Sequence, residues 1–114
     1  MRILKAGTRL QEALLGKGVE IVQFGSAGCA PCTALKSKLE VWCRAHPGVM
    51  FWYVPLEACP ELAAQAGIFT APAVQIFVEG RLTIQESGYF SLEAIFARLE
   101  RYLTLMAEPP SERL

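Results

Sequence analysis

The sequence predicts an α/β fold with a central mixed sheet of four to five strands and helices on both of its faces. Short apolar segments rich in β-branched residues alternate with amphipathic segments of helical period along most of the chain. Strands joined through a helix are parallel, whereas the last two apolar segments are joined by Glu79-Gly80, which suits the tight turn of an antiparallel hairpin. The two kinds of connection together require a mixed sheet.

The first half of the chain alternates helix and strand after an optional short edge strand. Thr8 is the expected N-cap of a short helix that ends before Gly16. Residues 19–24 form an apolar segment typical of a buried strand. Residues 30–45 carry apolar side chains on one side and charged ones on the other, and His46-Pro47-Gly48 ends this helix.

The second half predicts a strand, a short helix, the hairpin and a long final helix. The short helix begins at Cys59-Pro60 with proline in its first position and ends at Gly67, and Ser91 is the expected N-cap of the final helix. The strands are expected over residues 49–54, 73–78 and 81–85. We therefore predict one domain over residues 1–106, followed by a flexible C-terminal tail over residues 107–114.

Composition excludes several function classes. The 114 residues include eleven basic and eleven acidic side chains, so there is no net charge to attract nucleic acid or an anionic membrane. No segment approaches the roughly 20 apolar residues that a membrane span needs. Four cysteines are few for a disulfide framework, and the first residues do not resemble a signal peptide. These features favour a cytoplasmic protein with mostly reduced thiols.

The stretch with the most chemical content is Cys29-Ala30-Pro31-Cys32, which lies between a predicted strand and a predicted helix. The start of a helix offers unpaired N–H groups and the positive end of the helix dipole, which favour a thiolate at Cys29. Pro31 fixes the helix start. Cys29 is therefore the expected nucleophile, partly exposed, and the more buried Cys32 is the expected resolving thiol.

With its surroundings, this stretch resembles the thioredoxin family, and the resemblance extends over about residues 1–105. It rests on Phe24 before the cysteine loop, the Cys29–Cys32 motif, Gly67 with Pro72 five residues later, and Gly80 with Gly88 around the last strand. The resemblance implies the thioredoxin fold and protein-disulfide reduction without a bound cofactor. It also implies disulfide-containing protein substrates and an upstream thiol reductase, either a thioredoxin reductase or the glutathione system.

The resemblance assigns roles to Ala71 and Pro72. In the family the matching proline is cis and packs beside the two cysteines, where it keeps metal ions away from them. The residue before it offers backbone groups that pair with a substrate strand. Carried over, Ala71 supplies those groups and Pro72 faces the Cys29–Cys32 pair.

The rim of the predicted site departs from the family pattern. Gly28 stands where a tryptophan commonly precedes the first cysteine, Gly25 replaces a second aromatic residue, and Ala30 replaces the usual glycine between the cysteines. We expect a flatter, more flexible rim that binds generic substrates less well. Three aromatic residues could compensate by lying near it: Phe69, Tyr89 and Phe90.

The buried side of the site departs further. Gln23 occupies the position of the family's buried aspartate, which accepts a proton from the second cysteine, and Tyr53 occupies about the position of its lysine partner. Gln23 can hydrogen-bond the sulfur or hold a water, but it cannot act as a base at neutral pH. We therefore expect slower turnover than is usual in the family, with Glu57 as the nearest substitute carboxylate.

The remaining thiols and the single histidine receive structural interpretations first. Cys43 falls on the buried face of its helix and is expected to be a small core side chain. Cys59 is expected to be a solvent-facing cap, and the alternative is a thiol of lowered pKa that links two chains of an otherwise monomeric protein or becomes glutathionylated. His46 is expected to cap the end of its helix.

Three functions are open at this point. The favoured one is a thiol–disulfide oxidoreductase that acts through Cys29 and Cys32. The second is a thioredoxin-fold adaptor that binds partners around Ala71 and Pro72 and has a vestigial or regulatory dithiol. The third is a metal site on the two cysteines, which lacks a second pair of ligands at the spacing of structural zinc.

Overall fold

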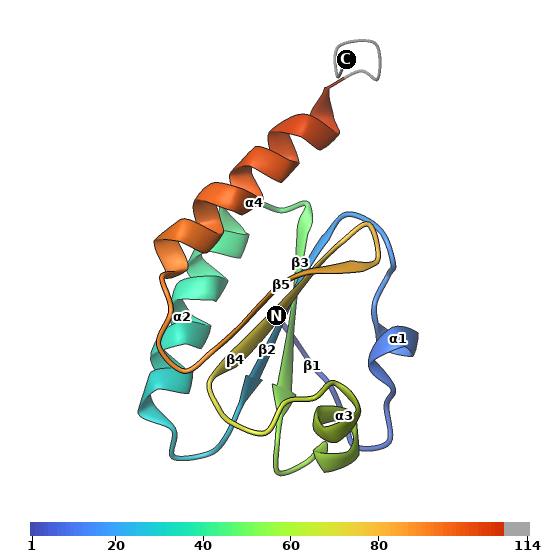
Figure 1. Ribbon diagram of the computed structural model, residues 1–114, viewed down its shortest axis with the longest axis vertical. Coiled ribbons are helices and arrows are strands. Elements are labelled where there is room, and N and C mark those ends of the chain that lie inside the picture. Colours follow the sequence, from blue (N-terminus) through green and yellow to red (C-terminus); the bar gives the residue numbers. More distant parts are fainter. Residues whose placement is uncertain (109–114) are drawn as a thin grey trace.

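A five-stranded sheet forms the centre of the computed structural model, which describes residues 1–108 (Figure 1). The strands are β1 (Arg2–Ile3), β2 (Val19–Gly25), β3 (Val49–Pro55), β4 (Ala73–Val78) and β5 (Arg81–Ser87). Their order across the sheet is β1-β3-β2-β4-β5. β1, β3 and β2 are parallel, whereas β4 and β5 pair antiparallel with their neighbours. The predicted mixed sheet, including the optional edge strand, is confirmed.

Helices cover both faces of the sheet, as predicted. They are α1 (Leu10–Ala13), α2 (Ala30–Arg44), α3 (Pro60–Gln65) and α4 (Leu92–Ala107). The long helices α2 and α4 lie on one face, and the short helices α1 and α3 lie on the other (Figure 1). No helix within residues 1–108 is both long and apolar enough to cross a membrane.

Alternation along the central strand β2 divides the core in two. Successive side chains of a strand point to opposite faces. Val19 and Ile21 pack with buried residues of α2 and α4, whereas Val22 and Phe24 pack with the cluster beneath α3. All seven residues of β2 are buried, including the polar Glu20 and Gln23. Two polar side chains in the central strand must find partners there, because burial without hydrogen bonds is costly.

The start of α1 corrects the sequence prediction. Thr8 is not the N-cap: its backbone N–H donates to the carbonyl of Lys5 in a turn, and Arg9 is the cap, without a side-chain hydrogen bond. The Glu20 carboxylate influences where the helix ends, because its Oε1 accepts from the N–H groups of Leu15 and Gly16 at 2.7 and 3.1 Å. The sequence pattern around α1 does not predict this contact, because Glu20 belongs to strand β2.

The C-terminal half matches its prediction more closely. Glu79 and Gly80 both have positive φ, 52° and 81°, as a two-residue hairpin turn requires. Ser91 caps α4 through its Oγ, which accepts from the N–H of Ala94 at 3.1 Å. Ala107, predicted as the first residue of the tail, is the last residue of α4. Glu108 is its C-cap, and residues 109–114 of the predicted tail lie outside the described residues.

Candidate active site

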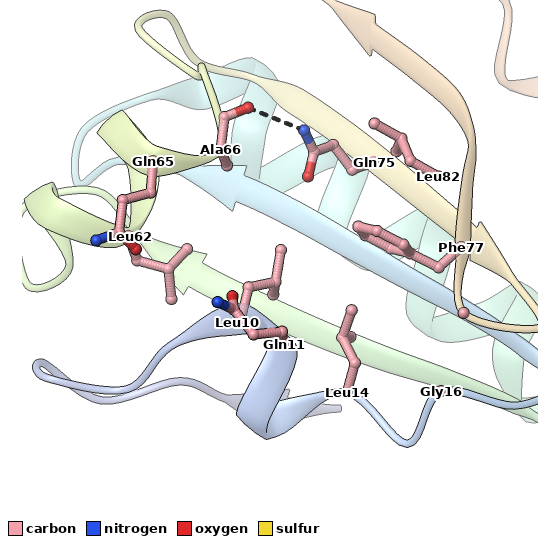
Figure 2. Close-up of a pocket in the computed structure, with 11 residues that line it drawn as sticks. Leu10, Gln11, Leu14, Gly16, Leu62, Gln65, Ala66, Gln75, Phe77 and Leu82 are labelled. Carbon is pink, nitrogen blue, oxygen red and sulfur yellow. Dashed lines mark hydrogen bonds between the residues drawn. The ribbon is translucent and has the colours of Figure 1, made fainter.

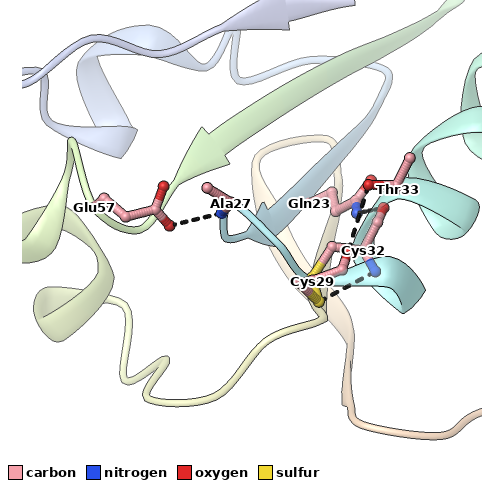
Figure 3. Close-up of a disulfide and its surroundings, with 6 residues drawn as sticks. All are labelled: Gln23, Ala27, Cys29, Cys32, Thr33 and Glu57. Carbon is pink, nitrogen blue, oxygen red and sulfur yellow. Dashed lines mark hydrogen bonds between the residues drawn. A yellow bond between two sulfur atoms is a disulfide. The ribbon is translucent and has the colours of Figure 1, made fainter.

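Strand β2 delivers the chain to the cysteine motif. The strand ends at Gly25, the next three residues form a loop, and α2 begins at Ala30 with Cys29 as its N-cap and Pro31 in its first turn. Gly28 has φ +75°, a conformation that favours glycine. Cys29 and Cys32 form a disulfide at this strand-to-helix turn (Figure 3). The position predicted for the redox pair is therefore the position observed.

The two cysteines differ in exposure, as predicted. Cys29 is half-buried, whereas Cys32 is 1% exposed. Cys29 Sγ accepts a hydrogen bond from the backbone N–H of Cys32 at 3.2 Å. The same N–H, at the positive end of the α2 dipole, would stabilise negative charge on that sulfur after reduction. This geometry favours Cys29 as the attacking thiolate and Cys32 as the thiol that stays inside.

Pro72 lies beside the motif. The Ala71–Pro72 peptide bond is cis, as the resemblance implies, and Pro72 is buried while Ala71 is half-buried. Pro31 and Pro72 line one groove of about 240 Å³ with Tyr89 and Phe90. A chain that lay in this groove would therefore contact the two prolines and an aromatic edge.

The rim has one aromatic side, built from the segment between β5 and α4. Tyr89 is fully exposed and Phe90 is half-buried, and both line the groove. Phe69 is 80% exposed but is not among the residues that line it. A Cβ at Gly28 would meet nothing within 4 Å, so that side of the rim is open. Two of the three predicted aromatic residues thus lie at the groove.

Gln23 lies directly beneath the start of α2. Its side chain is fully buried, and Nε2 donates to the backbone carbonyl of Cys32 at 2.8 Å (Figure 3). The amide nitrogen therefore binds the main chain of Cys32, a partner that the sequence analysis did not name beside the sulfur and a water. Oε1 is buried and has no hydrogen-bond partner within residues 1–108.

Tyr53 is the register partner of Gln23 on the adjacent strand β3, so the tyrosine lies beside this position in the sheet. Lys36 of α2 places its Nζ 4.7 Å from the centre of the Tyr53 ring. Burial, together with the negative charge of Glu57, raises the pKa of Tyr53. The phenol is therefore neutral at pH 7 and is no base.

Tyr53 also explains Gly25. A Cβ at Gly25 would collide with the Tyr53 hydroxyl and lie 2.9 Å from its Cζ. The ring from β3 therefore fills space above β2 that a side chain at position 25 would need. The absence of an aromatic residue at position 25 and the presence of one at position 53 are linked by this contact.

Glu57 is not a substitute base at Cys32. Its Oε1 accepts from the backbone N–H of Ala27 at 3.2 Å, and Figure 3 shows this carboxylate on the far side of Ala27 from the disulfide. It orders the cysteine loop from outside. The sequence suggestion was wrong because proximity along β3 does not determine which side of the loop a flexible glutamate reaches.

The structure overturns both expectations for Cys59. Its side chain is 3% exposed and Sγ donates to the carbonyl of Leu4 at 3.6 Å, so it is neither a solvent-facing cap nor an accessible link between two chains. Burial raises the pKa of this thiol, opposite to the lowered pKa of the alternative. The N-terminal segment covers the cap, and nothing local to Cys59-Pro60 signals that contact.

Cys43 and His46 have the structural positions that were expected. Cys43 is half-buried against the core beneath α2, and burial raises its pKa to about 11. His46 Nδ1 donates to the carbonyl of Trp42 at 2.8 Å, and the two rings stack. No group of three or more metal-binding side chains converges within residues 1–108, so the alternative of a metal site has two thiols and no further ligand.

A second pocket, of about 390 Å³, lies between α1, α3 and the β4–β5 hairpin (Figure 2). Leu62, Phe77 and Leu82 contribute apolar walls, and Gln75 donates through Nε2 to the carbonyl of Ala66 at 3.1 Å. None of the predicted site residues lines it. The pocket belongs to the opposite core and not to the cysteine pair.

Comparison with known proteins agrees with this geometry. The family model described as Thioredoxin matches residues 3–101. Thioredoxin of Alicyclobacillus acidocaldarius subsp. acidocaldarius is 32% identical over 90 residues, which cover 78% of this chain and 86% of the relative. Thioredoxin of Mus musculus is 26% identical over 90 residues, covering 77% of this chain and 86% of the relative.

Solved structures show the same fold. The structure of Fasciola hepatica thioredoxin superposes with a TM-score of 0.77 at 24% identity and covers 90% of this chain and 99% of its own. Plasmodium falciparum thioredoxin gives 0.75 at 18% identity with the same coverage. At these identities the likeness establishes architecture, and the sequence matches establish kinship. The chain thus belongs to the thioredoxin family, and it is a thiol–disulfide oxidoreductase.

Proposed function

We propose that this protein exchanges disulfides with a narrow set of protein partners, with Cys29 as nucleophile and Cys32 as resolving thiol, and that it turns over more slowly than a general-purpose thioredoxin. The observation that carries the proposal is the asymmetry of the pair. Cys29 is half-buried and accepts the Cys32 N–H, whereas Cys32 is enclosed.

The exchange has two balanced steps. The Cys29 thiolate attacks one sulfur of a partner disulfide, and the other partner sulfur leaves as a thiolate. Cys32 then loses its proton and attacks the Cys29 sulfur, which releases the second partner thiolate and forms the Cys29–Cys32 disulfide. The pair has donated two electrons. An upstream dithiol or glutathione must then reduce the disulfide again.

The groove beside the motif is the proposed partner site. Pro31, Pro72 and Tyr89 line it, and Ala71 immediately precedes the cis bond. Ala30 follows the N-cap residue Cys29 and is exposed. An extended partner segment in this groove would pair with the backbone of Ala71 and bring its disulfide to Cys29.

The slow turnover is inferred from the second step. Cys32 must give up its proton before it attacks, and the neighbouring side chains Gln23 and Tyr53 are neutral at pH 7. General-base assistance contributes roughly 10²–10⁴-fold where it operates. Without it the proton passes to solvent or to the leaving partner thiolate.

The narrow partner range is inferred from the rim. Gly28 leaves one side without a side chain, and Tyr89 supplies contact area only on the other. Aromatic residues are typical anchors of protein interfaces. A partner that brings its own protruding side chain to the Gly28 side would gain contacts that a generic substrate lacks.

The proposed setting is the cytoplasm, with a thioredoxin reductase-like enzyme or glutathione as electron donor and with the protein as a monomer. Cys43 and Cys59 are free thiols, which fits a reducing compartment. The buried Cys59 offers no site for a covalent dimer.

Insulin reduction tests the assignment. We expect the wild-type protein to reduce insulin disulfides in the presence of dithiothreitol, and Cys29→Ser to abolish this activity. Cys43→Ser removes a thiol outside the site and is the matched control. We expect its activity to equal that of the wild type. Activity retained in Cys29→Ser contradicts the proposal. A protein that binds partners in pull-down but reduces none would instead be the adaptor.

A further inference from the structure

The second pocket, between α1, α3 and the β4–β5 hairpin, has the size and the lining of a small-molecule site. Its volume of about 390 Å³ falls within the roughly 300–1,000 Å³ that is usual for ligand pockets. Among residues 1–108, no charged side chain lines it, and no residue lines both this pocket and the groove at Pro72. The larger apolar side chains in its walls are those of Leu10, Leu14, Leu62, Phe77 and Leu82. The second pocket is therefore separate from the proposed partner site.

Hydrogen bonds fix the loop between α1 and β2 at one end of this pocket. Glu79 in the hairpin turn donates its backbone N–H to the carbonyl of Gly18 at 2.9 Å, and Glu79 Oε2 accepts from the N–H of Gly18 at 3.3 Å. A Cβ at Gly80 would lie 3.1 Å from the carbonyl oxygen of Gly16, so the hairpin packs directly against this loop. Glu20 holds the same loop from the sheet. A pocket that is already formed lowers the entropic cost of binding a ligand.

Gln75 of β4 places a buried amide in the wall of the pocket. The residue is 3% exposed, and its Nε2 donates to the carbonyl of Ala66 at 3.1 Å and to Gln85 Oε1 at 3.0 Å. Both amide hydrogens are used, and a flipped amide would set Oε1 against the Ala66 carbonyl. The amide orientation is therefore fixed, with Oε1 as the free end of the side chain.

Gln75 Oε1 has no hydrogen-bond partner among residues 1–108. It is not sealed in the core, unlike the unpartnered oxygens of Glu20 and Gln23. Figure 2 shows this oxygen directed away from Ala66 and toward the side chains of the pocket. A buried acceptor that lacks a donor is costly, so a ligand that brings a donor to this position is favoured over one that does not.

We propose that the second pocket binds a small, uncharged, mostly apolar molecule that carries one N–H or O–H donor. The apolar part of the ligand packs against the leucine and phenylalanine walls, and the donor binds Gln75 Oε1. An ion is disfavoured, because it would lose its hydration without meeting a side chain of opposite charge. A ligand with acceptors alone would leave the Gln75 oxygen unpaired.

An NMR titration of the full chain with indole tests the proposal. Benzofuran is the matched ligand, because it has nearly the shape of indole but an oxygen in place of the N–H donor. We expect indole to shift the side-chain amide signals of Gln75 in a saturable manner and to bind about fivefold more tightly than benzofuran, the effect of one net hydrogen bond. Equal affinity for the two ligands, shifts that do not saturate, or shifts centred on Tyr89 and Phe90 would overturn the proposal.

Gln75→Leu tests the role of the acceptor, because leucine has a similar volume and no polar atom. We expect this variant to bind indole and benzofuran with equal affinity. A retained preference for indole contradicts the proposal. Because both ligands are measured on the same variant, a general loss of stability does not imitate the expected result.

Leu82→Ala and Leu105→Ala test the apolar wall without depending on the folding of Gln75→Leu. The two leucines are similarly exposed, at 48% and 46%, but Leu82 lines the pocket and Leu105 lies on α4 away from it. We expect Leu82→Ala to weaken the binding of both ligands about fivefold through lost apolar contact, and Leu105→Ala to leave it unchanged. Equal effects of the two substitutions would overturn the proposal. Insulin reduction reports on the cysteine pair and not on this pocket.

Discussion

At the scale of single residues, the site depends on a neutral pair side by side on β2 and β3. Gln23 binds the Cys32 carbonyl, and Tyr53 lies under Lys36 and over Gly25. The resemblance to the family leads one to expect an aspartate and a lysine at these positions. The aspartate would be a base for Cys32, whereas the Gln23 amide donates and accepts hydrogen bonds but takes up no proton at neutral pH. The two cysteines lie at the strand-to-helix turn, and neither Gln23 nor Tyr53 is a base at neutral pH.

Gln23→Asp should therefore raise insulin-reduction turnover. We expect a gain of at least about tenfold, within the range of general-base effects. Gln23→Asn is the matched control, because asparagine has the same length as aspartate but no ionisable group. This variant should show no gain in turnover. The measurement is the rate at saturating dithiothreitol. Equal rates for the two variants would show that proton removal at Cys32 does not limit turnover.

Gly25→Ala should destabilise the protein through Tyr53. The added Cβ would lie 2.9 Å from Tyr53 Cζ, and overpacking of this kind costs about 1–3 kcal/mol. Tyr53→Leu should remove most of this steric conflict. In urea unfolding we therefore expect the double variant to lose less free energy of unfolding than the sum of the losses in the two single variants. Strict additivity would mean that the two positions are not coupled.

At the scale of elements, a feature could be predicted from the sequence when the residues in contact lie close together along the chain. Ser91 sits three residues before the N–H that its Oγ accepts, so its cap is readable from sequence and is present. Thr8 has the same chemistry but lies in a turn before α1. The end of α1 involves Glu20, and the burial of Cys59 involves Leu4, both contacts with other elements. Local patterns predict the first kind of feature and miss the second.

Ser91→Ala should cost about 1 kcal/mol of stability, since it removes the side-chain cap of α4. Thr8→Ala, the matched substitution at a residue that caps nothing, should change the free energy of unfolding by less than about half of that. Chemical denaturation of both variants checks this. A larger loss for Thr8→Ala than for Ser91→Ala would contradict the assignment of the two caps.

At the scale of the whole molecule, the topology brings distant segments to one end of the sheet. The end of β2 supplies the cysteine loop, the approach to β4 supplies Pro72, and the chain after β5 supplies Tyr89. The mixed sheet was predictable, because buried strands and the hairpin turn each leave a local signature, whereas the place of Pro72 beside the cysteines followed from the resemblance to the thioredoxin family. The Tyr53–Gly25 contact was not predictable, since it requires the register of β2 against β3.

The groove at this end predicts a surface effect. Tyr89→Ala should slow exchange with a protein disulfide about tenfold while leaving stability nearly unchanged, because the fully exposed ring contributes to the groove and not to the core. Phe69→Ala is the control: it removes another strongly exposed aromatic residue that does not line the groove, and exchange should be unaffected. An equal decrease of the exchange rate in the two variants would show that partners do not bind in the groove.

Cys29 and Cys32 are proposed to have different roles, and trapping of the mixed disulfide separates them. Cys32→Ser and Cys29→Ser proteins are each incubated with a disulfide-bonded peptide, and the adducts are mapped by mass spectrometry. We expect a stable adduct on Cys29 in Cys32→Ser and essentially none on Cys32 in Cys29→Ser. Adducts of equal yield on both cysteines, or adducts mainly on Cys43 or Cys59, would contradict it.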